Sequence, residues 1–196
     1  MPNGVDIGWF KPIDRNDCRA KLGWKMETKV ILFNGSHDGN QAVKNLPLAK
    51  TTVNIVKKVV SEIRLHVMSS ATREQVRLML NAADCLLVTS LHEGSPNIVK
   101  EAMACNLPVV SVPCGDVIER LSTTRRGAIC AYDPATLAEA LHEVFKAGQR
   151  SNGREQLLAQ GLTTVKVAER LIQIYHLAQQ KYSSRPENRH RKICVE

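Results

Sequence analysis

Two carboxylates flank a Gly-Ser-Pro-Asn turn within the stretch HEGSPNIVKEAMACNLPVVS. They are Glu93 and Glu101, eight positions apart, and an apolar run follows the second acid. Ser95 is predicted to cap a helix, with Pro96 as the first helical residue, because the N–H that proline lacks would have had no partner inside the helix. The sequence therefore predicts two acids on either side of a helix start.

This helix start is suited to binding an anion. The backbone N–H groups of Asn97, Ile98 and Val99 are predicted to point outward with the positive end of the helix dipole, which favours a phosphate group. Gly94 leaves the approach free of a side chain. Glu101 lies one turn beyond Asn97 and leans back toward the helix start, where a carboxylate can accept hydrogen bonds from a ribose diol.

Glu93 is predicted to lie on the opposite side of the bound phosphate, where it would meet hydroxyl groups of whatever the phosphate carries. The two acids, Glu93 and Glu101, would then bracket a nucleotide diphosphate-sugar. Two solvated carboxylates around an ordinary capped helix fit the same spacing. The spacing alone therefore leaves both interpretations open.

Short apolar runs alternate with longer amphipathic ones along most of the chain, which predicts an α/β fold with a single Rossmann-like, doubly wound parallel sheet and helices on both faces. The predicted strands are KVILFNG, IRLHVM, CLLVTS, LPVVSV and GAICA. The predicted helices cover residues 46–60, 73–84, 96–105, 116–121, 134–147, 154–160 and 163–181. Ligands of such sheets bind at the carboxyl ends of the strands, so the strand CLLVTS brings residues 91–97 to that edge.

Composition predicts one cytoplasmic domain. The chain has 196 residues, 43% of them apolar, which is enough for one core. The longest uncharged stretch covers 14 residues, 102–115, and contains two prolines, so no membrane span is predicted. The N-terminus lacks the pattern of a signal peptide. Six scattered cysteines, without C-x-x-C or H-E-x-x-H, predict reduced thiols and no bound metal or cofactor.

The net charge of +8 is spread along the chain. Residues 181–196 contain five Lys/Arg and two Glu, so this segment carries +3 and residues 1–180 carry +5. Basic and aromatic residues do not interleave on one element, so nucleic-acid binding is not expected. A basic surface suits a nucleotide diphosphate or, in peripheral contact, an anionic membrane. We expect residues 1–181 to form the domain and residues 182–196 to be a basic, disordered tail.

Four segments in order resemble the donor-binding, C-terminal domain of retaining GT-B glycosyltransferases (glycosyl transferases group 1, family 4-like). They are PNGVDIGWFKP, KVILFNGSHDGNQAVKN, LNAADCLLVTSLHEG and EGSPNIVKEAMACNLPVVSVPCGDVIE. The resemblance covers residues 2–180. It implies one half of a GT-B fold and transfer of a sugar from a nucleotide diphosphate-sugar to an acceptor with retention of configuration, without a metal.

The resemblance also implies roles for particular residues. Glu93 and Lys44 would be catalytic, with Glu93 touching the donor sugar hydroxyls and Lys44 neutralising the departing diphosphate. A solvated loop lysine remains the alternative for Lys44. The remaining donor-binding residues would lie in the loop after the first strand and at the helix start: Gly35, Ser36, Gly94, Ser95, Pro96, Asn97, Ile98 and Glu101.

Two departures from the family pattern affect what is expected of this chain. Ser36 follows Gly35 where many members have an arginine, so one cation for the diphosphate is missing, and His37 or Arg73 are candidates to replace it. The N-terminal, acceptor-binding domain of the family is absent, so the chain alone is expected to be inactive. A non-catalytic nucleotide-sugar binding module and half of a GT-B nucleotide-sugar epimerase remain alternatives.

Overall fold

The computed structural model describes residues 1–35 and 41–183 and confirms the predicted parallel sheet. Its strands are β1 (Lys29–Asn34), β2 (Ile63–Met68), β3 (Cys85–Val88), β4 (Val109–Ser111) and β5 (Ala128–Ile129). They lie in the order β2-β1-β3-β4-β5, and every pairing is parallel. The chain therefore runs from β1 outward to the edge strand β2, and then crosses to the other side of β1 to form β3. The topological switch point lies between β1 and β3, where ligands of such sheets bind.

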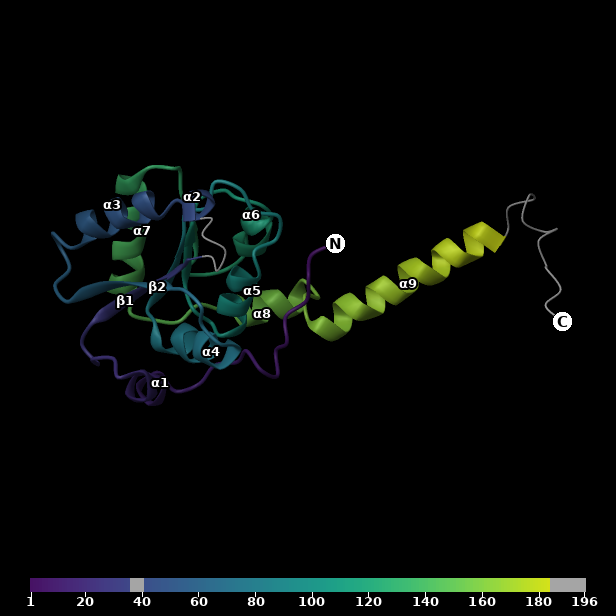
Figure 1. Ribbon diagram of the computed structural model, residues 1–196, viewed down its shortest axis with the longest axis horizontal. Coiled ribbons are helices and arrows are strands. Elements are labelled where there is room, and N and C mark those ends of the chain that lie inside the picture. Colours follow the sequence, from purple (N-terminus) through teal and green to yellow (C-terminus); the bar gives the residue numbers. More distant parts are fainter. Residues whose placement is uncertain (36–40, 184–196) are drawn as a thin grey trace.

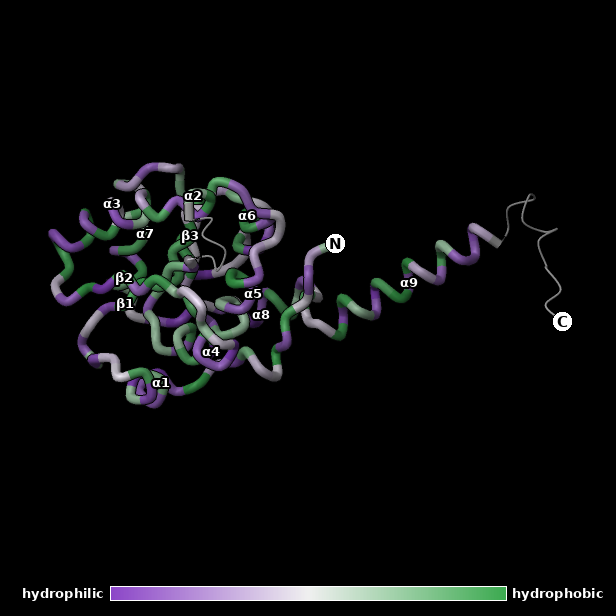
Figure 2. The backbone as a smooth tube through the Cα atoms, in the orientation of Figure 1, coloured by the Kyte–Doolittle hydropathy of each residue, from purple (hydrophilic) through white to green (hydrophobic). Residues whose placement is uncertain are grey.

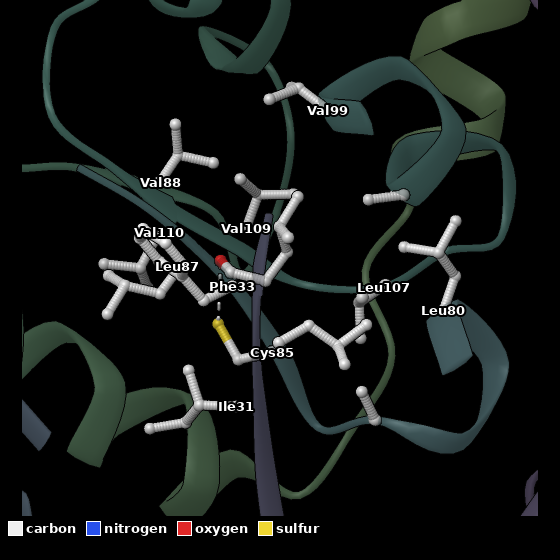
Figure 3. Packing of buried hydrophobic residues seen from close by; sticks show 14 of the residues in the cluster. Ile31, Phe33, Leu80, Cys85, Leu87, Val88, Val99, Leu107, Val109 and Val110 are labelled. Carbon is white, nitrogen blue, oxygen red and sulfur yellow. Dashed lines mark hydrogen bonds between the residues drawn. The ribbon is translucent and has the colours of Figure 1, made fainter. Parts of the chain in front are cut away.

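The central strands are buried, which explains their nearly continuous apolar runs. Ile31 of β1 stands opposite Leu65 of β2 on one side and Cys85 of β3 on the other. All four residues of β3 and all three of β4 are buried. Figure 3 shows side chains of these strands packed together, with Val99 reaching toward them from a covering helix. The sheet thus forms a rigid base for the loops at its carboxyl edge.

Helices cover both faces of the sheet, as expected for right-handed crossovers. In the described residues they are α1 (Arg15–Leu22), α2 (Gln41–Lys44), α3 (Leu46–Val56), α4 (Arg73–Ala82), α5 (Asn97–Ala104), α6 (Val117–Leu121), α7 (Pro134–Ala147), α8 (Gly153–Ala159) and α9 (Thr164–Ser183). Helices α3 and α7 pack against each other, and on the opposite face α1 packs on α4 and α5 on α8 (Figure 1).

Two helices were not predicted, and the helix predicted over 46–60 was four residues too long. Helix α1 begins at the N-cap Asp14, whose carboxylate accepts hydrogen bonds from two backbone N–H groups, and ends at Gly23 with φ +65°. The short α2 lies just before α3. The helix expected over 46–60 ends at Val56, and Glu62 with φ +54° then turns the chain into β2.

Helix α9 extends away from the rest of the domain (Figure 1). Apolar stretches recur along it (Figure 2), and its exposed apolar side chains are Val165, Leu171, Ile172, Ile174, Tyr175, Leu177 and Tyr182. At its base, Val5 forms a parallel bridge with Thr163. No helix in the described part of the chain is both long and apolar enough to cross a membrane. Of the predicted tail, residues 184–196 lie outside the described residues.

Candidate functional site

A pocket of about 200 Å³ lies at the carboxyl edge of the sheet, between the end of β1, the end of β2 and the start of α5. Its lining includes Gly35, Ser70, Asn97, Ile98 and Glu101. A Cβ on Gly35 would stand 2.9 Å from a methyl carbon of Val67 and 3.0 Å from the carbonyl oxygen of Met68. A residue with a side chain there would push the ends of β1 and β2 apart and change the pocket.

The start of α5 presents two backbone donors beside this pocket. Helix α5 begins at Asn97, and no acceptor in the described part of the chain bonds the N–H of Asn97 or Ile98. The prediction of a third available donor is wrong, because the N–H of Val99 donates to the carbonyl of Pro96 at 3.2 Å. The positive end of the helix dipole adds to the two free N–H groups, so an anion is favoured here.

The predicted cap of this helix is also wrong. The structure places Pro96, not Ser95, at the N-cap, and α5 has no side-chain cap. The hydroxyl of Ser95 instead donates to Oδ2 of Asp116 at 2.8 Å and accepts from Nζ of Lys100 at 2.9 Å. Because that hydroxyl is engaged on both sides, it fixes the turn by contacts with two other side chains rather than by a local cap.

The carboxylate of Glu101 is largely enclosed and has no hydrogen-bond donor among the residues that the structure describes. Burial raises its pKa, and the positive charges of Arg73 and Lys100 oppose that rise. Arg73 is held by Asp6 at 3.0 Å and lies over the rings of Trp9 and Phe10. A carboxylate without a protein donor, in a pocket open to solvent, is available to hydroxyl groups of a ligand.

On the β3 side of the turn, Glu93 forms an ion pair with Lys44. Its Oε1 accepts from Nζ of Lys44 and from the hydroxyl of Ser90 at 2.9 Å. No residue in the described ranges donates to Oε2 of Glu93. Neither Glu93 nor Lys44 lines the pocket of Glu101, and the turn of residues 94–96 joins the two parts of the site.

Lys44 is positioned by the loop that follows β3. The hydroxyl of Thr89 donates to the carbonyl oxygens of Lys44 at 2.8 Å and Asn45 at 3.0 Å, and the N–H of Leu91 donates to the carbonyl of Val43 at 2.8 Å. These contacts tie α2 to the sheet edge. The lysine and the glutamate, 49 positions apart in sequence, therefore meet because β1 and β3 are neighbours in the sheet.

A family model described as glycosyl transferases group 1 matches residues 53–147, a stretch that includes β3, the turn and both acids. Together with the relatives and solved structures that follow, this match supports a C-terminal domain of a group 1 glycosyltransferase.

Known proteins support the same assignment for the fold. The chain is 24% identical over 175 residues to D-inositol 3-phosphate glycosyltransferase of Mycolicibacterium gilvum, covering 77% of this chain but 40% of that protein. A solved C-terminal domain of a glycosyl transferase group 1 family protein from Francisella tularensis matches with TM-score 0.66 and 15% identity, over 80% of this chain and 97% of that one. Anabaena HepE in complex with UDP matches with TM-score 0.72 and 15% identity, over 88% and 56%.

This glycosyltransferase domain carries most of its predicted site residues at one edge of the sheet. Gly35, Asn97, Ile98 and Glu101 line the pocket, whereas Ser36, like His37, lies outside the described residues. A Cβ on Gly94 would meet nothing within 4 Å, which agrees with an open approach to the helix start. Among the described residues, no three His, Cys, Asp or Glu side chains gather as a metal site requires.

Several polar residues that hold the turn and its flanking loops together were not predicted from the sequence. They are Thr89, Lys100, Asp116 and Tyr132, whose hydroxyl donates to the carbonyl of Ser90 at 3.0 Å. A lysine between the apolar residues Val99 and Ala102 of the helix NIVKEAMA was the one visible signal, since a polar residue on a buried face requires partners. The partners themselves have no local sequence pattern.

Proposed function

We propose that this domain binds the nucleotide diphosphate-sugar donor of a retaining glycosyltransferase. One observation carries the proposal: the carboxylate of Glu101 lacks a donor among the described residues and shares a pocket with the start of α5, where the N–H groups of Asn97 and Ile98 are free. A ribose diol would satisfy the carboxylate, and a phosphate would satisfy the N–H groups. The match to the family model and the likeness to a UDP complex support the same ligand.

The diphosphate, the base and the sugar of the donor are assigned to regions that adjoin this pocket. The diphosphate would contact the backbone of residues 94–98 together with Gly35 and Ser36. A groove of about 490 Å³ shares Met68, Ser70 and Ala71 with the pocket and offers the base a place beyond the ribose. The sugar would point the other way, past the turn, toward Glu93. No metal or cofactor enters this assignment.

Glu93 and Lys44 supply the charges for the chemical step. During transfer the bond between the anomeric carbon and the diphosphate oxygen breaks, and negative charge grows on the leaving oxygens. Lys44 lies at the end of α2 to neutralise that charge, and Glu93 holds the lysine through Oε1 while Oε2 meets a hydroxyl of the sugar. A preorganised ion pair acts without reorganisation cost at the moment of reaction.

Sugar transfer would need a second lobe to supply the acceptor wall of the cleft. The chain spans about 40% of the length of the curated relative described above. An acceptor nucleophile must be held within about 3–3.5 Å of the anomeric carbon and shielded from water. We therefore expect residues 1–196 alone to bind the donor but to transfer its sugar poorly. A cytoplasmic location and contact with a membrane surface stay predictions.

Binding is tested by thermal unfolding of residues 1–196 with UDP-, GDP- and ADP-sugars. A ligand that binds only the folded state raises the apparent stability, by about 2.7 kcal/mol at a hundred times its Kd. We expect one of the three series to raise the midpoint and the free sugars to leave it unchanged. If none of the nucleotides raises it, the donor-binding function is wrong.

Catalysis is tested by joining residues 1–196 to an upstream acceptor lobe in one polypeptide. Transfer should appear in the longer protein, and Glu93→Ala should remove most of it while nucleotide binding persists. Sugar transfer by residues 1–196 alone at the rate of the longer protein would contradict the need for a second lobe. A change in the configuration of the donor sugar, without transfer to an acceptor, would indicate an epimerase instead.

A further inference from the structure

Lys100 is a buried cation beside the turn that begins α5. Its side chain is 0% exposed, and its Nζ donates to the carbonyl oxygen of Asn3 at 3.0 Å and to the hydroxyl of Ser95 at 2.9 Å. Both of these acceptors are neutral. Since burying an ammonium group is costly unless hydrogen bonds compensate it, these two contacts must account for its presence.

The contact with Ser95 continues to the loop after β4. The Ser95 hydroxyl donates to Oδ2 of Asp116 at 2.8 Å, and Nε of Arg120 donates to the same oxygen at 3.1 Å. The backbone N–H of Asp116 also donates to the carbonyl of Gly94 at 3.1 Å. Asp116 therefore holds Gly94 by its backbone and Ser95 by its side chain, while Lys100 holds Ser95 from within α5.

Gly115 brings the loop after β4 directly onto the backbone of the turn. It has φ +54°, and a Cβ there would stand 2.5 Å from the carbonyl oxygen of Gly94 and 2.8 Å from that of Glu93. No side chain fits between the two loops. The turn is thus held between α5 on one side and residues 115 and 116 on the other.

Another buried cation of this chain shows what a purely structural role looks like. Arg19 is also 0% exposed, but its guanidinium donates to the carbonyl oxygens of Ala82, Lys25 and Met26 and pairs with Asp84 at 2.9 Å. These partners lie at the amino edge of the sheet. The side-chain partner of Lys100, in contrast, is part of the turn at the proposed donor site.

We propose that Lys100 is a positioning residue of this site. By holding Ser95 from within α5, while Asp116 holds Ser95 and Gly94 from the opposite loop, it keeps residues 94–96 in the conformation that aims the N–H groups of Asn97 and Ile98 at a diphosphate. This inference rests on the function proposed above. The contact with Asn3 anchors the same network close to the bridge between Val5 and Thr163.

The test separates the phosphate contacts from the ribose contact. Residues 1–196 are titrated by calorimetry with UDP, GDP and ADP, and the tightest of these is compared with its own nucleoside. The ratio of the two affinities measures what the diphosphate adds. Lys100→Met should lower the affinity for the nucleoside diphosphate about tenfold and leave that for the nucleoside nearly unchanged, because Glu101 contacts only the ribose.

Three further variants serve as controls. Arg19→Met removes a buried cation of equal exposure, so it should lower stability without changing the ratio. Asp116→Ala should reduce the ratio as Lys100→Met does, whereas Asp116→Asn retains an acceptor for the Ser95 hydroxyl and should restore most of it. The Asp116 pair decides the question if Lys100→Met does not fold, which thermal unfolding shows beforehand.

The outcomes test the positioning role of Lys100 separately from the diphosphate site itself. An unchanged ratio in folded Lys100→Met, or in Asp116→Ala when the lysine variant does not fold, overturns the positioning role and leaves donor binding intact. An equal loss for nucleoside and nucleoside diphosphate also overturns it, because a general structural effect would then suffice. If the unmutated chain binds the nucleoside diphosphate no better than the nucleoside, the diphosphate site fails and the positioning role fails with it.

Discussion

At the amino edge of the sheet, Asp84 accepts hydrogen bonds from Arg15 at 2.6 Å, from Arg19 at 2.9 Å and from the N–H of Val30 at 2.7 Å. At the carboxyl edge, the carboxylate of Glu101 accepts none from the residues that the structure describes. The cavity next to Asp84 holds about 40 Å³, and the pocket of Glu101 about 200 Å³. The two acids thus differ in partners and in the space before them.

This difference separates a structural carboxylate from one that awaits a ligand. The charge of Asp84 is balanced by the chain itself, so it joins α1, β1 and β3. An enclosed carboxylate without a donor costs free energy in the free protein. A ligand that donates hydrogen bonds to the carboxylate would offset this cost. An acid with a shifted pKa in a pocket is therefore a candidate functional residue. Stability should therefore depend on Asp84, and nucleotide binding on Glu101.

The largest expected effect is on stability, from Asp84→Ala. Removing this carboxylate leaves Arg19 buried without its counter-charge, and breaking a buried ion pair in this way costs about 3–5 kcal/mol. Urea denaturation would measure the loss in the free energy of unfolding. Glu101→Ala is the matched control and should cost far less, since no described residue donates to that carboxylate and would be left unpaired. Equal losses in the free energy of unfolding for the two variants would contradict the distinction between a structural and a ligand-binding carboxylate.

The next effect is on ligand affinity, from Glu101→Ala. Losing the hydrogen bonds between the carboxylate and a ribose diol should weaken nucleoside diphosphate binding by about 1–3 kcal/mol, as measured by calorimetry. The 2′,3′-dideoxy nucleotide should bind the unmutated chain as weakly as it binds the variant. Equal affinity of ribose and dideoxy forms for the unmutated chain would reject the role of Glu101.

Two glycines with similar backbone conformations are expected to respond differently to the same substitution. Gly23 at the end of α1 has φ +65° and open space around its missing Cβ, whereas Gly115 has φ +54° and the Gly94 carbonyl oxygen 2.5 Å from that position. Gly23→Ala should cost about 1–2 kcal/mol of stability from the left-handed conformation alone. Gly115→Ala should cost more and should also weaken diphosphate binding, because the turn must move. Identical effects of both variants, by denaturation and calorimetry, would argue against close packing at the turn.

The smallest expected effect is a pH dependence of nucleoside binding. The pKa of Glu101 is raised above its usual 4.5 by burial. As pH falls through that raised value, the carboxylate gains a proton and loses an acceptor site, so affinity for the nucleoside should fall. A nucleoside is the suitable probe because it carries no phosphate that titrates. Calorimetry from pH 8 downward should show this dependence in the unmutated chain and a flat profile in Glu101→Gln.

Stability should respond to the same titration with the opposite sign. The folded chain holds the Glu101 proton to a higher pH than the unfolded chain, so it binds more protons in the window between 4.5 and the raised pKa. The contribution of Glu101 to the free energy of unfolding is therefore present below pH 4.5 and is lost as pH rises through the folded pKa. A Glu101→Gln variant should lack this loss in denaturation experiments across the window.

Much of the fold followed from local patterns. The strand and helix alternation placed all five strands, and the helix over 134–147 begins and ends where it was predicted. Helix α1 was missed because its apolar positions are few, although Asp14 and Gly23 mark its two ends. The cap was assigned wrongly at Ser95 because a serine before a proline fits the local rule. Its hydroxyl is instead bound by Asp116 and Lys100, 21 and 5 positions away.

Local sequence patterns were sufficient to predict the parallel sheet, the position of the turn at its carboxyl edge and the face of α5 that carries Asn97 and Glu101. These features depend on periodicity and on neighbouring residues, which local physical chemistry controls. Only the tertiary structure decided that Lys44 meets Glu93, that Asn3 meets Lys100 and that Glu101 stands without a donor among the described residues. Such contacts join distant segments, and their geometry arises when the strands pair and the helices pack.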